Sequence, residues 1–183
     1  MTKIQKNVAK LEKLCAKNNF LFSLYALPYR GVLNREIKLA KITETDTVLN
    51  VGCGAMPFTA IYIAQKTGAR VIAMDKDIEA INKAKLLVEF LGLSSLIKVI
   101  HGDGVDIKEL DYNKIVVALQ VWPKEEVIAN LLENSKFGVE MLVRYPRRFF
   151  IKYYGSVSLK ADACARHLML TFGKTYLFQK KVA

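Results

Sequence analysis

The sequence predicts an α/β fold in which helices flank a mostly parallel sheet. From Thr43 onward, short apolar segments that suit strands alternate with amphipathic segments that suit helices, a pattern typical of parallel sheets. The first expected strand covers residues 47–51, runs directly into Gly52-Cys53-Gly54, and is followed by a helix near Pro57. This order places the glycines at the carboxyl edge of the sheet, where open α/β folds bind ligands.

The later segments continue this alternation, so the expected core is Rossmann-like. Further strands are predicted over residues 70–74, 97–100, 114–118 and 139–143. Further helices are predicted from Ile78 to Gly92 and from about Pro123, where Glu125 and Glu126 would favour the helix dipole. The C-terminus is predicted to form an antiparallel hairpin, with strands over 167–172 and 175–179 and a turn at Gly173-Lys174.

Residues 1–42 are predicted to form a helical extension of the core at 43–183, within a single domain. Asn18-Asn19 is expected to end a first helix, an apolar and aromatic stretch then reaches Tyr29, and a second helix covers 33–41. The apolar residues that share one face of the first helix are Ile4, Val8, Leu11 and Cys15. The lysines beside that face are Lys3, Lys6, Lys10, Lys13 and Lys17.

Composition narrows the functional classes. The net charge is +11, which suits an acidic partner such as nucleic acid, although a lysine stripe is also a common solvated face. Three widely separated cysteines form neither a disulfide framework nor a zinc spacing, so we expect a reducing, cytoplasmic location and no metal. We expect neither a signal peptide nor a membrane span, because charged residues interrupt every apolar run.

Three features at successive strand ends predict a cofactor site. The Gly52-Cys53-Gly54 turn would let a ligand approach the backbone, with the helix N–H groups beyond it. Asp75 closes the second strand, where its carboxylate could accept hydrogen bonds from both hydroxyls of a ribose, with Lys76 beside it. Gly102-Asp103-Gly104 follows the third strand, and Asp103 could accept from an adenine amino group.

Simpler interpretations remain open for each of these residues. Asp75 could be an acid at a helix N-terminus, and Asp103 could be a turn residue between glycines. Cys53 has no histidine partner in sequence and is expected to pack as a small residue. His101 and His167 are expected to be structural.

With this order of motifs, the chain resembles the class I S-adenosylmethionine-dependent methyltransferases over about residues 43–145. The resemblance implies S-adenosylmethionine as cofactor, bound by Gly52, Cys53, Gly54, Asp75, Lys76, Gly102, Asp103, Gly104 and Leu119. It departs from the family where Met56 replaces the third glycine and Pro57 follows. The implied function is methyl transfer to a small molecule or to RNA, the acceptor being undecided.

The segment from Gly52 to Thr59 also resembles the glycine–apolar–proline loop of the nicotianamine synthases. Two other regions, from Pro28 to Glu36 and around Arg144, look similar as well. This resemblance implies transfer of an aminocarboxypropyl group as the alternative reaction. Acceptor contacts are expected from the loop at 119–123 and from Tyr25, Tyr29, Gln120 and Arg144.

A catalytically silent S-adenosylmethionine-binding module is a further alternative. A second basic cluster stands near the C-terminus, with aromatic residues between its charges: Arg144, Arg147, Arg148 and Lys152. Such a segment suits either a single-stranded nucleic acid or a substrate carboxylate, or it could be a buried aromatic segment with a basic rim.

Overall fold

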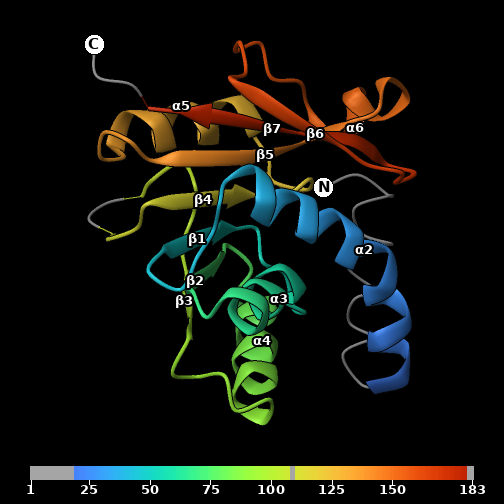
Figure 1. The fold of residues 1–183 in the computed structure, drawn as a ribbon, viewed down its shortest axis with the longest axis vertical. Helices are drawn as coiled ribbons and strands as arrows, with labels where there is room; N and C mark the ends of the chain where they lie inside the picture. Colours follow the sequence, from blue (N-terminus) through green and yellow to red (C-terminus); the bar gives the residue numbers. More distant parts are fainter. Residues whose placement is uncertain (1–18, 108–109, 181–183) are drawn as a thin grey trace.

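The computed structural model describes residues 19–107 and 110–180, with the side chains described from Tyr29 onward. It contains one seven-stranded sheet in the order β3-β2-β1-β4-β5-β7-β6 (Figure 1). The strands are β1 (Thr47–Val51), β2 (Arg70–Asp75), β3 (Ile97–His101), β4 (Lys114–Val117), β5 (Glu140–Pro146), β6 (Ala163–Arg166) and β7 (Phe172–Gln179). Strands β1 to β5 pair in parallel, and β7 pairs antiparallel with both β5 and β6. The mostly parallel α/β fold and the C-terminal antiparallel hairpin are therefore confirmed.

Helices cover both faces of the sheet, as its strand sequences require. The helices are α2 (Asn19–Leu39), α3 (Phe58–Thr67), α4 (Ile78–Phe90), α5 (Lys124–Asn134) and α6 (Ile151–Tyr154), with a short 3-10 turn η1 (Arg148–Phe150) before α6. The central strands read as continuous apolar runs because parallel strands bury both faces. Successive residues thus face opposite layers: Val48 packs toward α3 and α4, whereas Leu49 packs toward α5.

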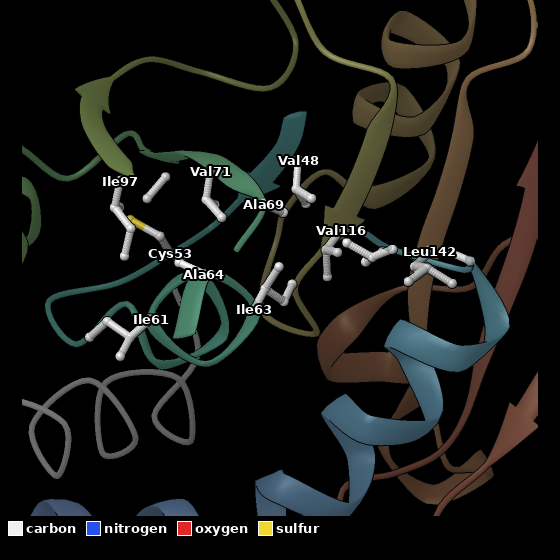
Figure 2. Close-up of a cluster of buried hydrophobic side chains, with 14 of the residues drawn as sticks. Val48, Cys53, Ile61, Ile63, Ala64, Ala69, Val71, Ile97, Val116 and Leu142 are labelled. Carbon is white, nitrogen blue, oxygen red and sulfur yellow. The ribbon is translucent and has the colours of Figure 1, made fainter. Parts of the chain in front are cut away.

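The larger core layer lies between the sheet and α3 and α4. Figure 2 shows Ile61, Ile63 and Ala64 of α3 close to Val71 and Val116 of the sheet, in one buried cluster. The other layer packs Val127, Ile128 and Leu131 of α5 against the opposite face. These two layers hold the strands in register and thereby fix the positions of the loops at their carboxyl ends.

The N-terminal helices differ from the sequence prediction. Asn19 is the first described residue and lies in α2, which continues through Pro28 to Leu39, so the second expected helix over 33–41 is part of a longer helix. Pro28 removes one backbone hydrogen-bond donor from this helix. The helix nevertheless continues, and it packs along α3. The residues of the first expected helix and its lysines lie outside the described part of the chain.

The predicted position of the hairpin turn was wrong. Gly173 and Lys174 lie inside β7, and the connection between β6 and β7 spans residues 167–171. Tyr145 pairs with Lys174 and Pro146 pairs with Phe172, so Gly173 is the extra residue of an irregularity in the ladder. Glycine is common at such bulges as well as in turns, which explains the mistaken assignment.

Candidate cofactor site

The loops that follow β1, β2 and β3 meet at one edge of the sheet. The backbone N–H groups of Gly52 and Cys53 donate to the Met74 carbonyl at 2.9 and 3.0 Å, and Gly102 N–H donates to the Asp75 carbonyl at 3.0 Å. These bonds continue the parallel ladder past the strand ends. The three features predicted from sequence therefore lie side by side, as the topology of the sheet requires.

Backbone conformation explains the two glycines of the first loop. Gly52 and Gly54 have φ values of 78° and 68°, a region that residues with a side chain rarely adopt. A Cβ atom on Gly52 would also lie only 2.6 Å from Val121 Cγ2, in the loop after β4. The glycine turn thus lets the loops after β1 and β4 approach each other closely.

Asp75 connects the second loop to the first. One carboxylate oxygen accepts from Gly54 N–H at 2.8 Å, and the other accepts from Asp77 N–H at 3.0 Å. The capping role that sequence also allowed belongs to Asp77, whose carboxylate accepts from Glu79 and Ala80 N–H at the start of α4. A carboxylate has about four acceptor positions, so Asp75 retains capacity for further donors at this edge.

Lys76 reaches across the same edge. Its Nζ donates to the Trp122 carbonyl at 2.9 Å and lies 3.9 Å from Asp103 Oδ2. The other Asp103 oxygen accepts from Val105 N–H at 3.3 Å, which is the turn geometry expected of an aspartate between glycines. Lys76 therefore links the loops after β2, β3 and β4, and both it and Asp103 are partly exposed.

The remaining candidates of the cofactor site contribute mainly by packing. Added Cβ atoms on Gly102 and Gly104 would lie 2.9 Å from Met74 Sδ and 2.7 Å from Val127 Cγ1. Cys53 is buried in the core layer of α3 and α4, as expected for a small packing residue. Leu119 is buried in a third apolar cluster, described below. Close packing is thus an additional reason for glycine at positions 102 and 104.

A buried polar network lies beside the glycine loop. Arg144 on β5 donates from Nε and Nη2 to the two carboxylate oxygens of Glu36 on α2, at 2.9 and 2.8 Å. Arg144 Nη2 also donates to the Thr59 hydroxyl on α3 at 3.1 Å. The side chains of Arg144 and Glu36 are 5% and 0% exposed. This bidentate pair joins α2, α3 and β5 immediately after the glycine loop.

The same network extends into the C-terminal hairpin. The Thr175 hydroxyl donates to Glu36 Oε1 at 2.7 Å, so it accepts from His167 Nε2–H at 2.9 Å. Burial lowers the pKa of His167, against an opposing effect of Glu36, and the imidazole is expected to be neutral. The structural role expected for His167 is consistent with this position. His101, by contrast, lies at the exposed end of β3 with Nε2 beside the Lys76 carbonyl.

Lys124 is a buried lysine that the sequence pattern did not single out. It is 1% exposed at the start of α5, and its Nζ donates to the Ala118 carbonyl at the end of β4 at 3.1 Å. Burial lowers its pKa to about 7, and the positive charge of Arg144 acts in the same direction. Within the described residues no acid forms a salt bridge with it. Only its place directly after Pro123, in the loop expected to contact the acceptor, could have drawn attention to it.

An aromatic and aliphatic cluster lies near the end of β4. Val32, Leu119, Tyr154 and Phe172 form its buried part. Tyr29 packs against it and lies edge-on to Phe58, with ring centroids 6.3 Å apart. Gln120 is half-buried next to Leu119. The side chain of Tyr25, another predicted acceptor contact, lies outside the described side chains.

Sequence comparisons find transferases. No known protein-family pattern matches the chain. The chain is 34% identical over 124 residues to an L-histidine 2-aminobutanoyltransferase of Yersinia pestis, covering 66% of this chain and 45% of that protein. It is also 34% identical over 116 residues to a probable ribosomal RNA small subunit methyltransferase A of Methanococcus vannielii, covering 62% and 41%. The chain thus spans less than half the length of these relatives.

Solved structures with the same fold include cofactor complexes. A mutant of MtNAS in complex with S-adenosylmethionine superposes with a TM-score of 0.84 and 21% identity, covering 94% of this chain and 73% of that one. An RNA methyltransferase from Salinibacter ruber in complex with S-adenosyl-L-homocysteine gives a TM-score of 0.68 at 17% identity, covering 84% and 92%.

The chain has the class I S-adenosylmethionine-dependent methyltransferase fold. This confirms the predicted Rossmann-like fold and the resemblance to the class I methyltransferases. In this fold, Gly54 and Asp103 lie in the loops after β1 and β3, and Asp75 is the last residue of β2. Among the described residues, no group of three or more potential ligands could hold a metal ion, and no helix is long and apolar enough to cross a membrane.

Proposed function

We propose that this protein is an S-adenosylmethionine-dependent transferase that moves the aminocarboxypropyl group to an amine acceptor. The observation that carries the choice of group is that the buried Glu36–Arg144 pair is hydrogen-bonded to Thr59 in α3, the helix that follows the glycine–proline loop. That pair joins α2 and the C-terminal strands to the start of α3, beyond the shared methyltransferase core. The identity to an L-histidine 2-aminobutanoyltransferase and the superposition on MtNAS support the same choice.

The cofactor fits the residues at the strand ends. Gly52 and Gly54 keep the backbone of the first loop free of side chains at positive φ. Asp75 retains acceptor capacity, which we assign to the ribose hydroxyls with Lys76 beside it, and we assign Asp103 to the adenine amino group. Leu119 would supply an apolar contact near the end of β4. We assign the cofactor contacts to these residues together with Cys53, Gly102 and Gly104.

The chemistry demands alignment more than covalent assistance. When bound, S-adenosylmethionine supplies carbon atoms activated by a positively charged sulfur that leaves as a neutral thioether. The protein must therefore hold the acceptor nitrogen in line with one of these carbons and exclude competing water. Tyr29, Gln120 and the cluster around Leu119 and Phe172 are assigned to the acceptor side. Arg144 contributes by holding Glu36, Thr59 and β5 in place.

Analysis of the by-products tests this function. The protein is incubated with S-adenosylmethionine and candidate amines, beginning with L-histidine, and the nucleoside products are separated by chromatography. Accumulation of methylthioadenosine supports aminocarboxypropyl transfer, whereas S-adenosylhomocysteine identifies methyl transfer. The Asp75→Ala variant is the control for spontaneous breakdown of the cofactor. Neither product with any amine or extract would contradict both enzymatic functions and favour a binding module.

Methyl transfer to RNA is the second candidate. It is favoured by the 34% identity to a probable ribosomal RNA methyltransferase and by the coverage of 92% of the Salinibacter ruber RNA methyltransferase. The same assay with total RNA as acceptor identifies this reaction through accumulation of S-adenosylhomocysteine.

We also propose that residues 1–183 form a single domain and that the protein is cytoplasmic. The buried Cys53 and exposed Cys164, both free thiols, are compatible with that location.

A further inference from the structure

One surface of the C-terminal region combines exposed apolar side chains with positive charge. Phe149 in η1 is 84% exposed, and Leu168 and Leu170 in the connection between β6 and β7 are 95% and 81% exposed. Arg147, Arg148 and Lys152 are exposed along the same segment as Phe149. We call these six residues the hairpin-tip patch. Large apolar groups so exposed, with charges between them, are typical of interaction sites.

The two halves of the hairpin-tip patch are joined by hydrogen bonds. The Arg147 side chain donates from Nε to the Met169 carbonyl at 2.7 Å, and Arg147 N–H donates to the Thr171 carbonyl at 3.0 Å. Leu168 and Leu170 flank Met169 in the chain, and Phe149 follows Arg147 by two residues. These bonds hold the exposed segment after β5 beside the connection that carries Leu168 and Leu170.

The residues next to Phe149 and Lys152 in the chain pack against the protein interior. Phe150 and Tyr153 pack against the cluster of Tyr154, Phe172 and Leu119, whereas Phe149 and Lys152 point outward. An added Cβ on Gly155, which ends α6, would lie 3.3 Å from the Trp122 ring in the loop after β4. The segment that carries Phe149 and Lys152 thus ends beside the loop assigned to the acceptor.

The charge of the surrounding chain is strongly one-sided. Without the buried Arg144, residues 145–180 contain seven arginines and lysines and a single acid, Asp162, so they carry +6 of the net charge of +11. Asp162 accepts from Gln179 N–H in the β6–β7 ladder. A partner that covers the patch must therefore supply repeated negative charges together with flat apolar groups.

We propose that the hairpin-tip patch binds a single-stranded polynucleotide. Bases have apolar faces that stack on an exposed aromatic ring, and their phosphates complement arginine and lysine. The neighbouring Leu168 and Leu170 would extend the apolar contact beyond Phe149. This binding does not depend on which group the enzyme transfers.

Fluorescence anisotropy with short labelled oligo(U) and oligo(dT) tests the proposal on the full chain. Each neutralised phosphate of a single strand contributes a salt slope of roughly 0.7. Three cations predict that affinity falls about twentyfold between roughly 50 and 200 mM salt. Phe149→Ser should weaken binding at least about fivefold, the lower limit for loss of one stacked base. The Arg148→Ala/Lys152→Ala double variant should reduce the salt slope.

Matched controls come from α4, on the other side of the molecule (Figure 1). Phe90 is 72% exposed there, and Lys83 and Lys85 are exposed. Phe90→Ser and Lys83→Ala/Lys85→Ala should leave both affinity and salt slope unchanged. Stronger binding of oligo(U) than of oligo(dT) would identify RNA as the partner, and equal binding would indicate either polynucleotide.

Three results would overturn the proposal. One is the absence of oligonucleotide binding at low salt. Another is an equal loss from the α4 controls and the patch variants, because the net charge alone would then explain binding. The third is patch-dependent binding to anionic phosphatidylserine vesicles without oligonucleotide binding, which would make the patch a lipid contact. Thermal melts of all variants accompany the binding data, and since every substituted side chain is exposed, melting temperatures should be unchanged.

Discussion

Replacing Asp75 by alanine should separate its cofactor role from its structural role. The variant loses a carboxylate at the end of β2 that accepts from Gly54 and Asp77 N–H. If the same carboxylate also accepts from ribose hydroxyls, the affinity for S-adenosylmethionine must fall. Stability must fall as well, because the first loop loses the bond that ties it to β2.

The magnitudes follow from the number of bonds. Each hydrogen bond to a charged group contributes roughly 1.5–3 kcal/mol. Loss of two ribose bonds should therefore weaken binding by at least about tenfold, even after partial replacement by water. The loss in the free energy of unfolding is expected at the lower end of that range, because Asp75 is only partly buried. Asp75→Asn should be milder, since it exchanges one acceptor for a donor.

Titration calorimetry beside a thermal melt measures both effects. Asp77→Ala is the matched control: it removes the N-cap of α4, which accepts from Glu79 and Ala80 N–H. That cap is worth about 1 kcal/mol of stability and touches no proposed ribose contact. An unchanged dissociation constant for Asp75→Ala, at a temperature where the variant is folded, would refute the ribose assignment.

Three further predictions concern the glycine loop and the buried charges. Gly54→Val should abolish the cofactor binding that calorimetry measures. Because φ at Gly54 is 68°, the variant should also lose roughly 1–2 kcal/mol of stability. Normal binding would place the cofactor elsewhere. Glu36→Gln should lower the free energy of unfolding in urea by about 3–5 kcal/mol, because it removes the carboxylate that accepts from the buried Arg144 guanidinium. The double variant Glu36→Leu/Arg144→Leu should recover much of this loss, because it leaves no unpaired buried charge. A larger loss in the double variant would contradict the reasoning. Burial lowers the pKa of Lys124 to about 7, against 10.5 in the unfolded chain. Between these two values the unfolded chain binds more protons than the folded one, so the free energy of unfolding should rise with pH over this range. Lys124→Met should therefore raise the free energy of unfolding near pH 7 and flatten its pH dependence, and identical pH slopes in the two proteins would show that Lys124 does not titrate in this range.

The position of the candidate site could be predicted because local patterns determine it. Apolar runs at Val48 and Val71 identify strands that are buried on both faces, and the residues after them must lie at the carboxyl edge of a parallel sheet. Gly54 and Asp75 were therefore expected to be neighbours, and they are joined by a hydrogen bond of 2.8 Å. Their chemistry follows from residue type and strand order.

Short-range periodicity was enough to predict the α/β alternation, the glycine turn and the edge of the sheet on which Asp75 lies. The pairing of Glu36 with Arg144, 108 residues away, and the burial of Lys124 became visible only in the folded chain. The same is true of the place of Gly173 in a strand, because a bulge and a turn require the same residue type. Long-range pairing and burial depend on how whole elements pack, and no local spacing records that packing.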